Sequence, residues 1–176
     1  MKTFKFLFLA LITVSLYSCG NDDDATDDND LAETWNLVAF TYEGTSVSTT
    51  GSDTIESSFN GVGENINSTF TFEENPNTFS AQGSYDIVLT TTINGEATTE
   101  TYTSSESGLA FDEDGTWTLN GSTLTIAANN GEIANFEVTT LTDDVLVLQA
   151  SQETSFEQGE TSQTSVINVT YTFNDL

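Results

Sequence analysis

The chain has 176 residues, with 28 acidic side chains, two basic side chains and no histidine, for a formal net charge of −26 at pH 7. This composition excludes nucleic acid as a partner, because almost nothing is present to neutralise its phosphates. It also leaves no histidine for general base catalysis or metal coordination. Carboxylates are the main titratable groups that remain, and none stands in a recognisable catalytic motif. We therefore expect a protein that is not an enzyme and carries no cofactor.

The N-terminus has the pattern of a secretory signal. Lys2 and Lys5 precede an apolar run over residues 6–16, which is shorter than the roughly 20 residues that a bilayer span needs. The Leu-Tyr-Ser-Cys segment that ends at Cys19 resembles a lipobox, where a bacterial signal peptidase cuts before a cysteine that becomes acylated. We expect residues 1–18 to be cleaved and Cys19 to carry a lipid that anchors the protein to a membrane. An ordinary signal with a chance cysteine is the alternative.

Cleavage at Cys19 would also change the charge of the protein. The mature chain keeps every acidic residue and no basic one, so its formal side-chain charge is 0 − 28 = −28. Residues 20–30 include six aspartates, and together with residues 31 and 32 they are expected to form a disordered tether. An acidic run directly after an acylated cysteine resembles the surface-export signal of Bacteroidota-type lipoproteins. It favours an outer-membrane lipoprotein that faces the cell exterior, and a plain solubilising spacer is the alternative.

The rest of the chain, residues 33–176, alternates apolar and polar side chains between turn signals. The Asn-Gly pairs at 94–95 and 120–121 are strong hairpin signals, and Gly83 indicates a bulge or bend. Residues 44–65 are polar and glycine-containing, and are expected to form a long loop. The expected strands cover residues 35–42, 68–73, 78–93, 97–103, 109–111, 117–120, 124–128, 136–141, 145–156 and 167–173, with a turn at 74–77 and a loop at 104–108.

No window of the mature chain has a convincing helical period. Strands in series with short connections favour an all-β, up-and-down antiparallel β-barrel of about 8–10 strands, which leaves no exposed sheet edge. A two-sheet β-sandwich is the alternative fold.

Several segments resemble the lipocalin-like families. The Leu-Ala-Glu-Thr-Trp-Asn-Leu segment at 31–37 resembles their opening Gly-x-Trp strand, with Glu33 in place of the glycine. Residues 115–126 look like their central hairpin, and residues 141–148 and 171–173 resemble their final strands. The resemblance implies a small barrel with Trp35 near its closed end, as in the lipocalin-like domains of Bacteroidota lipoproteins.

Apolar side chains that share strand faces are candidates for lining the barrel lumen and binding a ligand. They are Trp35, Leu37, Phe70, Phe72, Tyr85, Ile87, Trp117, Leu119, Phe136, Tyr171 and Phe173. Such a set either surrounds a cavity or packs into a solid core, because a barrel of about eight strands suits both. A ligand would be small, partly apolar, and neutral or cationic, since no base could meet an anion. A surface structural or interaction protein with a filled core, and a carbohydrate-binding sandwich, are the alternatives.

Two further segments resemble known site motifs. Asp112 and Asp114 belong to an Asp-x-Asp-Gly segment that occurs in calcium loops, although a hairpin turn explains it equally well. Thr54, within Asp-Thr-Ile, resembles an O-glycosylation motif of the same bacterial group. Apart from the membrane and a small ligand, the sequence indicates no partner, and we expect a monomer.

Overall fold

The computed structural model describes residues 31–107 and 114–176, which form nine β-strands and a single helical turn. All strand pairs are antiparallel. The elements are β1 (Thr34–Thr50), β2 (Asp53–Glu73), β3 (Thr78–Ile93), β4 (Glu96–Thr103), α1 (Ser104–Ser107), β5 (Gly115–Asn120), β6 (Thr123–Ala128), β7 (Ile133–Leu141), β8 (Val145–Gln158) and β9 (Thr161–Asp175).

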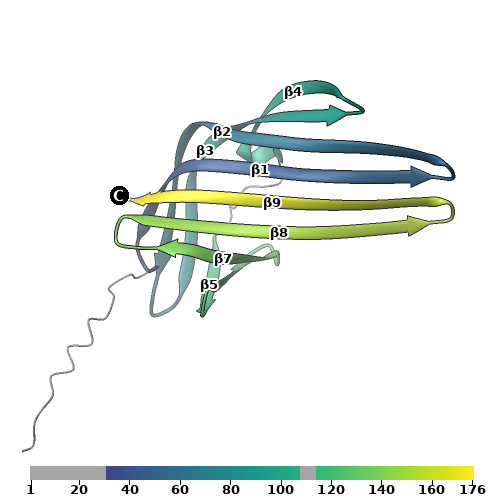
Figure 1. Cartoon of the computed structure of the whole chain (residues 1–176). Helices are drawn as coiled ribbons and strands as arrows, with labels where there is room; N and C mark the ends of the chain where they lie inside the picture. Colours follow the sequence, from purple (N-terminus) through teal and green to yellow (C-terminus); the bar gives the residue numbers. More distant parts are fainter. Residues whose placement is uncertain (1–30, 108–113) are drawn as a thin grey trace, which may run out of the picture.

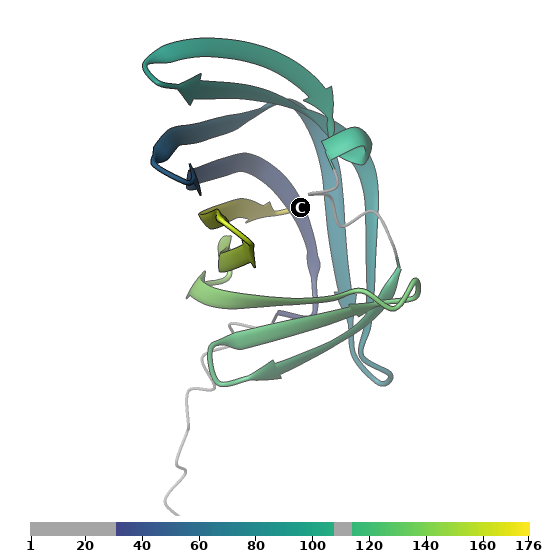
Figure 2. The same ribbon diagram turned by 90° about the vertical axis from the view of Figure 1, so that its right-hand side faces the viewer.

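The strands form one sheet that closes on itself, in the order β2-β1-β9-β8-β7-β6-β5-β3-β4 with a further pairing between β2 and β3 (Figures 1 and 2). Every strand except β4 is therefore part of a ring. The ring closes between β3 and β5 through only two residue pairs, Thr78 with Thr116 and Phe79 with Gly115. The expected up-and-down barrel is confirmed, and the sandwich alternative does not apply because the sheet is continuous.

The strands differ greatly in length, which gives the molecule two regions. We call the first region the barrel; it contains the short strands β5 to β7 and the parts of the long strands that lie beside them. The second region, which we call the wall, consists of three hairpins at residues 41–63, 86–103 and 150–170. Figure 1 shows the long hairpins extending as a sheet away from the end of the barrel where the C-terminus lies.

The prediction of a long loop at residues 44–65 is wrong. The first strand continues to Thr50, turns at Gly51 and Ser52, and returns as β2 from Asp53. These residues pair as strands because β1 has β2 on one side and β9 on the other from Thr41 to Thr50. The alternation of apolar and polar residues is missing because few of these side chains are buried on either face of the wall. Backbone pairing and the strand preference of threonine, valine and isoleucine form the strands instead.

Two of the irregularities in the strand pairing bear on which side chains face inward. Between Leu37 and Phe40, β1 has one more residue than β9, so Leu37 lies opposite Phe173 and Phe40 opposite Tyr171. The bulge shifts the alternation and turns Phe40, which a regular strand would point away from Leu37, into the interior.

The second irregularity lies in β2, between Glu64 and Asn67, next to the point where Ser68 pairs with Gly83 of β3. Gly83 has φ +94°, and a Cβ at this position would collide with the carbonyl oxygen of Asn67. The glycine thus marks the bend that its sequence context indicates, although the extra residue belongs to the partner strand.

The predicted turns are present with small differences. Asn94 and Gly95 both have positive φ, 50° and 87°, as a type I′ hairpin requires. In the second Asn-Gly pair the loop residues are Gly121 and Ser122, so the turn lies one residue later than the motif indicates.

Two segment boundaries also change. The predicted loop at 104–108 begins as the helical turn α1, where the Ser104 hydroxyl accepts a hydrogen bond from the Tyr85 amide at 3.4 Å. Leu31, which the sequence places in the tether, is only 2% exposed and packs in the core. The expected strand at 109–111 lies outside the described residues.

Candidate functional site

The interior of the barrel holds ten of the eleven predicted lumen residues in one buried cluster. Each of the ten is 5% exposed or less: Trp35, Leu37, Phe70, Phe72, Tyr85, Ile87, Trp117, Phe136, Tyr171 and Phe173. Leu119 is the exception, because it lies near the tip of the β5–β6 hairpin and is 37% exposed. The sequence therefore identifies the inward faces of the strands, with one residue misplaced at a strand end.

The set of predicted lumen residues also omits several residues of the core. Leu124, Ile126, Leu146 and Leu148 alternate along β6 and β8 and are all buried, so their spacing was a usable signal. Phe40 is 1% exposed, but the bulge that turns it inward has no signature in the sequence.

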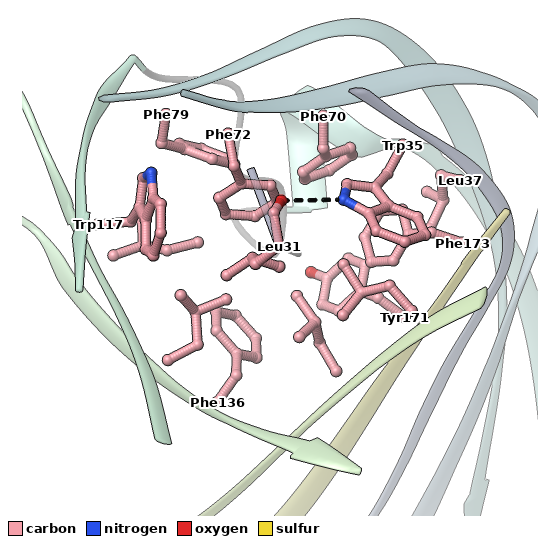
Figure 3. Packing of buried hydrophobic residues seen from close by; sticks show 14 of the residues in the cluster. Leu31, Trp35, Leu37, Phe70, Phe72, Phe79, Trp117, Phe136, Tyr171 and Phe173 are labelled. Atoms are coloured by element: carbon pink, nitrogen blue, oxygen red, sulfur yellow. Dashed lines mark hydrogen bonds between the residues drawn. The ribbon is translucent and has the colours of Figure 1, made fainter. Parts of the chain in front are cut away.

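Aromatic side chains fill the part of the lumen that lies away from the wall, which we call the floor (Figure 3). Positions nearer the wall are called upper. The rings of Phe70 and Phe173 meet edge to face with centroids 5.0 Å apart, and those of Phe72 and Phe79 lie 5.2 Å apart. Such distances are typical of packed aromatic pairs in protein interiors. In Figure 3, Leu31 lies between Phe72 and Trp35, among these buried side chains.

Both tryptophans are fixed by their ring nitrogens. Trp35 Nε1 donates to the Leu31 carbonyl at 3.2 Å, and Trp117 Nε1 donates to the Glu73 carbonyl at 3.0 Å. A buried indole N–H that lacks an acceptor would be costly, so these bonds hold the two rings in place. The hydrogen bond from Trp35 also ties the beginning of the described chain to the core.

Two tyrosines lie above the aromatic floor. The ring centroid of Phe40 is 5.2 Å from that of Tyr85 and 5.1 Å from that of Tyr171. Burial, together with the charge and hydrogen bond of the neighbouring Tyr85 hydroxyl, raises the pKa of Tyr171 well above its ordinary value of 10.0. Tyr171 is therefore neutral at physiological pH, and the two phenols place polar groups within the aromatic core.

A row of side chains across five strands follows directly above these tyrosines. The strand register aligns, on the inward face, Leu89, Gly61, Tyr42, Val169 and Ala150. Except for the glycine, all are partly exposed and pack on the buried cluster. Partial burial raises the pKa of Tyr42 above 10.0.

The next row on the same face contains Phe59, Gly44 and Ile167, and both of its apolar side chains are partly exposed. A Cβ on Gly44 would lie 2.8 Å from the Val166 carbonyl oxygen and 3.4 Å from the Phe59 ring, so glycine lets the ring lie against the strand. We call the apolar side chains of these two rows the ledge: Tyr42, Phe59, Leu89, Ala150, Ile167 and Val169.

A polar cluster borders the ledge on its outer side. Ser46 is 7% exposed, and its hydroxyl accepts hydrogen bonds from Gln163 Nε2 at 3.1 Å and from Ser165 Oγ at 2.9 Å. Ser57 Oγ donates to the Ser46 carbonyl at 3.4 Å. The face that rises from the barrel thus changes from aromatic to aliphatic to neutral polar. The carboxylates in these rows lie at the far side, on β4, where Glu100 pairs with Leu89 and Glu96 with Ile93.

The other sequence candidates do not join this region. Thr54 is exposed beside the β1–β2 turn, and its hydroxyl pairs with that of Thr49 at 3.3 Å. Asp114 is exposed just before β5, whereas Asp112 lies outside the described residues. Cys19 also lies outside them. Within residues 31–107 and 114–176 there is no group of acidic residues that could hold a metal ion.

These features define a class of protein: an antiparallel barrel with an aromatic floor and, next to it, the partly exposed apolar ledge. The model of the lipocalin-like domain family matches residues 31–148, and the chain belongs to this family. The match ends within β8, so the closing strand β9 lies beyond it. No curated protein and no solved structure matches the chain. In the described part of the chain, the single helix is far too short to span a membrane.

Proposed function

We propose that this lipocalin-like domain is a non-enzymatic binding module that holds a small, partly apolar, neutral or cationic molecule on the ledge. The lower lumen is packed with aromatic rings, which leaves the upper end as the place where apolar surface and the inward face coincide. The observation that carries the proposal is the double row of partly exposed apolar side chains above Tyr85 and Tyr171.

The charge of the chain limits the ligand. No lysine, arginine or histidine occurs after residue 5, so a carboxylate or phosphate would find no cationic partner. The 28 acidic side chains would also repel an anion that comes within the screening length of the solution. A neutral or positively charged molecule meets neither obstacle, and the serine and glutamine hydroxyl and amide groups beyond the ledge offer it hydrogen bonds.

Two dyes that differ by one sulfonate group test the charge preference. The purified protein is titrated with uncharged phenylnaphthylamine and with its anionic sulfonated analogue, and dye fluorescence is recorded. We expect the uncharged dye to bind at least about tenfold more tightly, because an unpaired buried anion is costly. Equal affinity for the two dyes would contradict the preference for neutral ligands.

A pair of neighbouring substitutions tests the position of the site. Ala150→Trp places a large ring on the ledge, whereas Gln149→Trp places it on the opposite, exposed face of the same strand. We expect the first variant to lose dye binding and the second to keep it. If both variants bind like the unmodified protein, the ligand does not use the ledge. Native mass spectrometry after exposure to cell extract then identifies natural occupants, and a domain that always stays empty counts against the proposal.

We further propose that the domain is held on the outer membrane, facing the exterior, by lipid on Cys19. The support comes from the lipobox-like segment before Cys19 and the acidic run at residues 20–30. Replacement of Cys19 by serine should release the protein from the membrane fraction. Protease treatment of intact cells should remove the domain, and full protection would argue for the periplasmic side instead.

A further inference from the structure

The outer half of β8 is an open sheet edge. The pairing of β8 with β7 ends at Gln149, whereas its pairing with β9 continues to Gln158. Residues 150–158 therefore have a strand partner on one side only, which Figure 1 shows at the lower border of the wall. All side chains from Ser151 to Gln158 are exposed. A backbone of this kind presents a row of N–H and C=O groups to which another chain can bind.

This edge lacks most of the features that usually prevent strand addition. Its register with β9 runs without a shift from Val145 to Gln158, so no bulge twists the edge away. Residues 150–158 contain neither proline nor lysine, the residues that most often protect an exposed edge. The segment is also long for an unpaired edge. Only its glutamates, Glu153 and Glu157, oppose the approach of another strand.

The two faces of the edge differ in chemistry. Glu153 and Glu157 lie four residues apart and thus share the outward face, while Phe156, 54% exposed, lies on the inward face with the ledge. A second copy of this chain is a poor partner: antiparallel pairing centred on Ser155 would place Glu153 opposite the partner's Glu157, and like charges directly opposite destabilise a strand pair. A strand with basic residues at those positions would be stabilised instead.

We propose that residues 150–158 accept an extended, basic segment of another protein as an added strand. Backbone hydrogen bonds supply the affinity, as in other cases of strand addition. Lysine or arginine opposite Glu153 and Glu157, and an apolar residue opposite Phe156, supply the specificity. Only Ala150, at the barrel end of the edge, also belongs to the ledge, so a ligand on the ledge leaves residues 151–158 free to accept a strand.

The open edge of β4 fits such a partner less well. Its glutamates, Glu96 and Glu100, are on the inward face, and the Tyr102 hydroxyl donates a hydrogen bond to Glu100. The outward face of β4 carries alanine and threonines, with no carboxylate and no large apolar side chain. β4 therefore provides a matched control for β8.

The test uses two peptides of equal length and composition as probes. In the first, lysine and valine alternate, so that one face is basic and the other apolar; in the second, the lysines are contiguous. Binding to the purified full chain is measured by fluorescence anisotropy of the labelled peptides, and hydrogen exchange locates the contact. We expect the alternating peptide to bind at least about tenfold more tightly. It should slow amide exchange in residues 150–158.

Two single substitutions with the same charge change complete the test. Ser155→Lys adds a positive charge to the centre of the β8 edge, and Thr101→Lys does the same on the outward face of β4. Both side chains are exposed, and far-UV circular dichroism verifies that the variants fold. Ser155→Lys should weaken binding of the alternating peptide about tenfold or more, and Thr101→Lys less than about twofold. Equal binding of the two peptides, equal effects of the two substitutions, or protection elsewhere would overturn the proposal.

Discussion

The barrel and the wall belong to the same sheet, yet they are stabilised in different ways. In the barrel, side chains such as Trp35, Leu146 and Phe173 are fully buried, and the sheet closes into a ring through the two residue pairs between β3 and β5. In the wall, strands with many threonines and serines pair over long distances, with open edges at β4 and β8. Burial of apolar surface is the dominant favourable term in folding. We therefore expect the barrel to determine global stability and the wall to provide surfaces for binding.

Two phenylalanines test this comparison most strongly. Phe173 is fully buried beside Phe70, whereas Phe156 is 54% exposed at the edge of the wall. Phe173→Ala should lower the free energy of unfolding by about 3–5 kcal/mol, because it removes a buried ring and leaves a cavity. Phe156→Ala should change it by less than about 0.5 kcal/mol. Urea denaturation followed by tryptophan fluorescence measures both, and similar losses would show that the wall contributes to global stability as much as the barrel.

The junction of the two regions depends on Gly83, which pairs with Ser68 next to the irregular segment of β2. In Gly83→Ala the new methyl would meet the backbone of Asn67 at a positive φ, and we expect a loss of about 3 kcal/mol. Gly95→Ala is the control, because its φ is also positive but nothing lies within 4 Å of the added methyl. It should cost only about 1 kcal/mol, the strain of the backbone alone. Equal losses would mean that the close approach to Asn67 relaxes freely.

The same division explains how much of the structure could be predicted from the sequence. In the barrel one face of each strand is buried, so residues such as Phe70 and Phe72 alternate with polar ones and identify the inward face. The turn at Asn94 and Gly95 was equally clear, because a type I′ hairpin needs two residues that tolerate positive φ. These local signals are sufficient for the fold class and most of the buried cluster.

The wall could not be predicted, because its strands are specified by distant partners. Residues 44–65 resemble a loop when considered alone. Residues 44–50 become a strand through pairing with β9, more than 100 positions later in the chain, and the returning strand β2 pairs with β1 and β3. The ledge was missed for a related reason. The bulge after Leu37 decides that Phe40 and Tyr42 face inward, and no residue in that segment indicates it. The alternation in β9 places Ile167 and Val169 on the same face as Tyr171. Whether they are buried like Tyr171 or partly exposed depends on how far the neighbouring strands extend, which the segment itself does not show.

High pH provides a smaller test, directed at the boundary between the floor and the ledge. The pKa of Tyr171 is raised in the folded state, chiefly by burial, so the folded protein holds this proton more tightly than the unfolded chain does. The resulting stability is fully present below pH 10.0 and is lost as the pH rises above that value towards the folded pKa. We expect the melting temperature to fall at alkaline pH. The fall should be shallower in Tyr171→Phe than in the control Tyr102→Phe, because the pKa of Tyr102 is raised chiefly by its hydrogen bond to Glu100 and not by burial in the core. An unchanged slope in Tyr171→Phe would assign the pH dependence to other groups.

The smallest expected effect concerns ionic strength. Residues 31–176 include no basic side chain, so their acidic side chains can only repel one another. Sodium chloride screens this repulsion beyond about 10 Å at 0.1 M, and we expect a gain of about 1 kcal/mol, or about 3 °C in melting temperature. The wall should respond first, because less buried apolar surface opposes the repulsion between its strands. Hydrogen exchange in the β8–β9 hairpin should therefore slow with added salt more than exchange in β6 and β7. A melting temperature that stays flat or falls with salt would show that self-repulsion is not significant in either region.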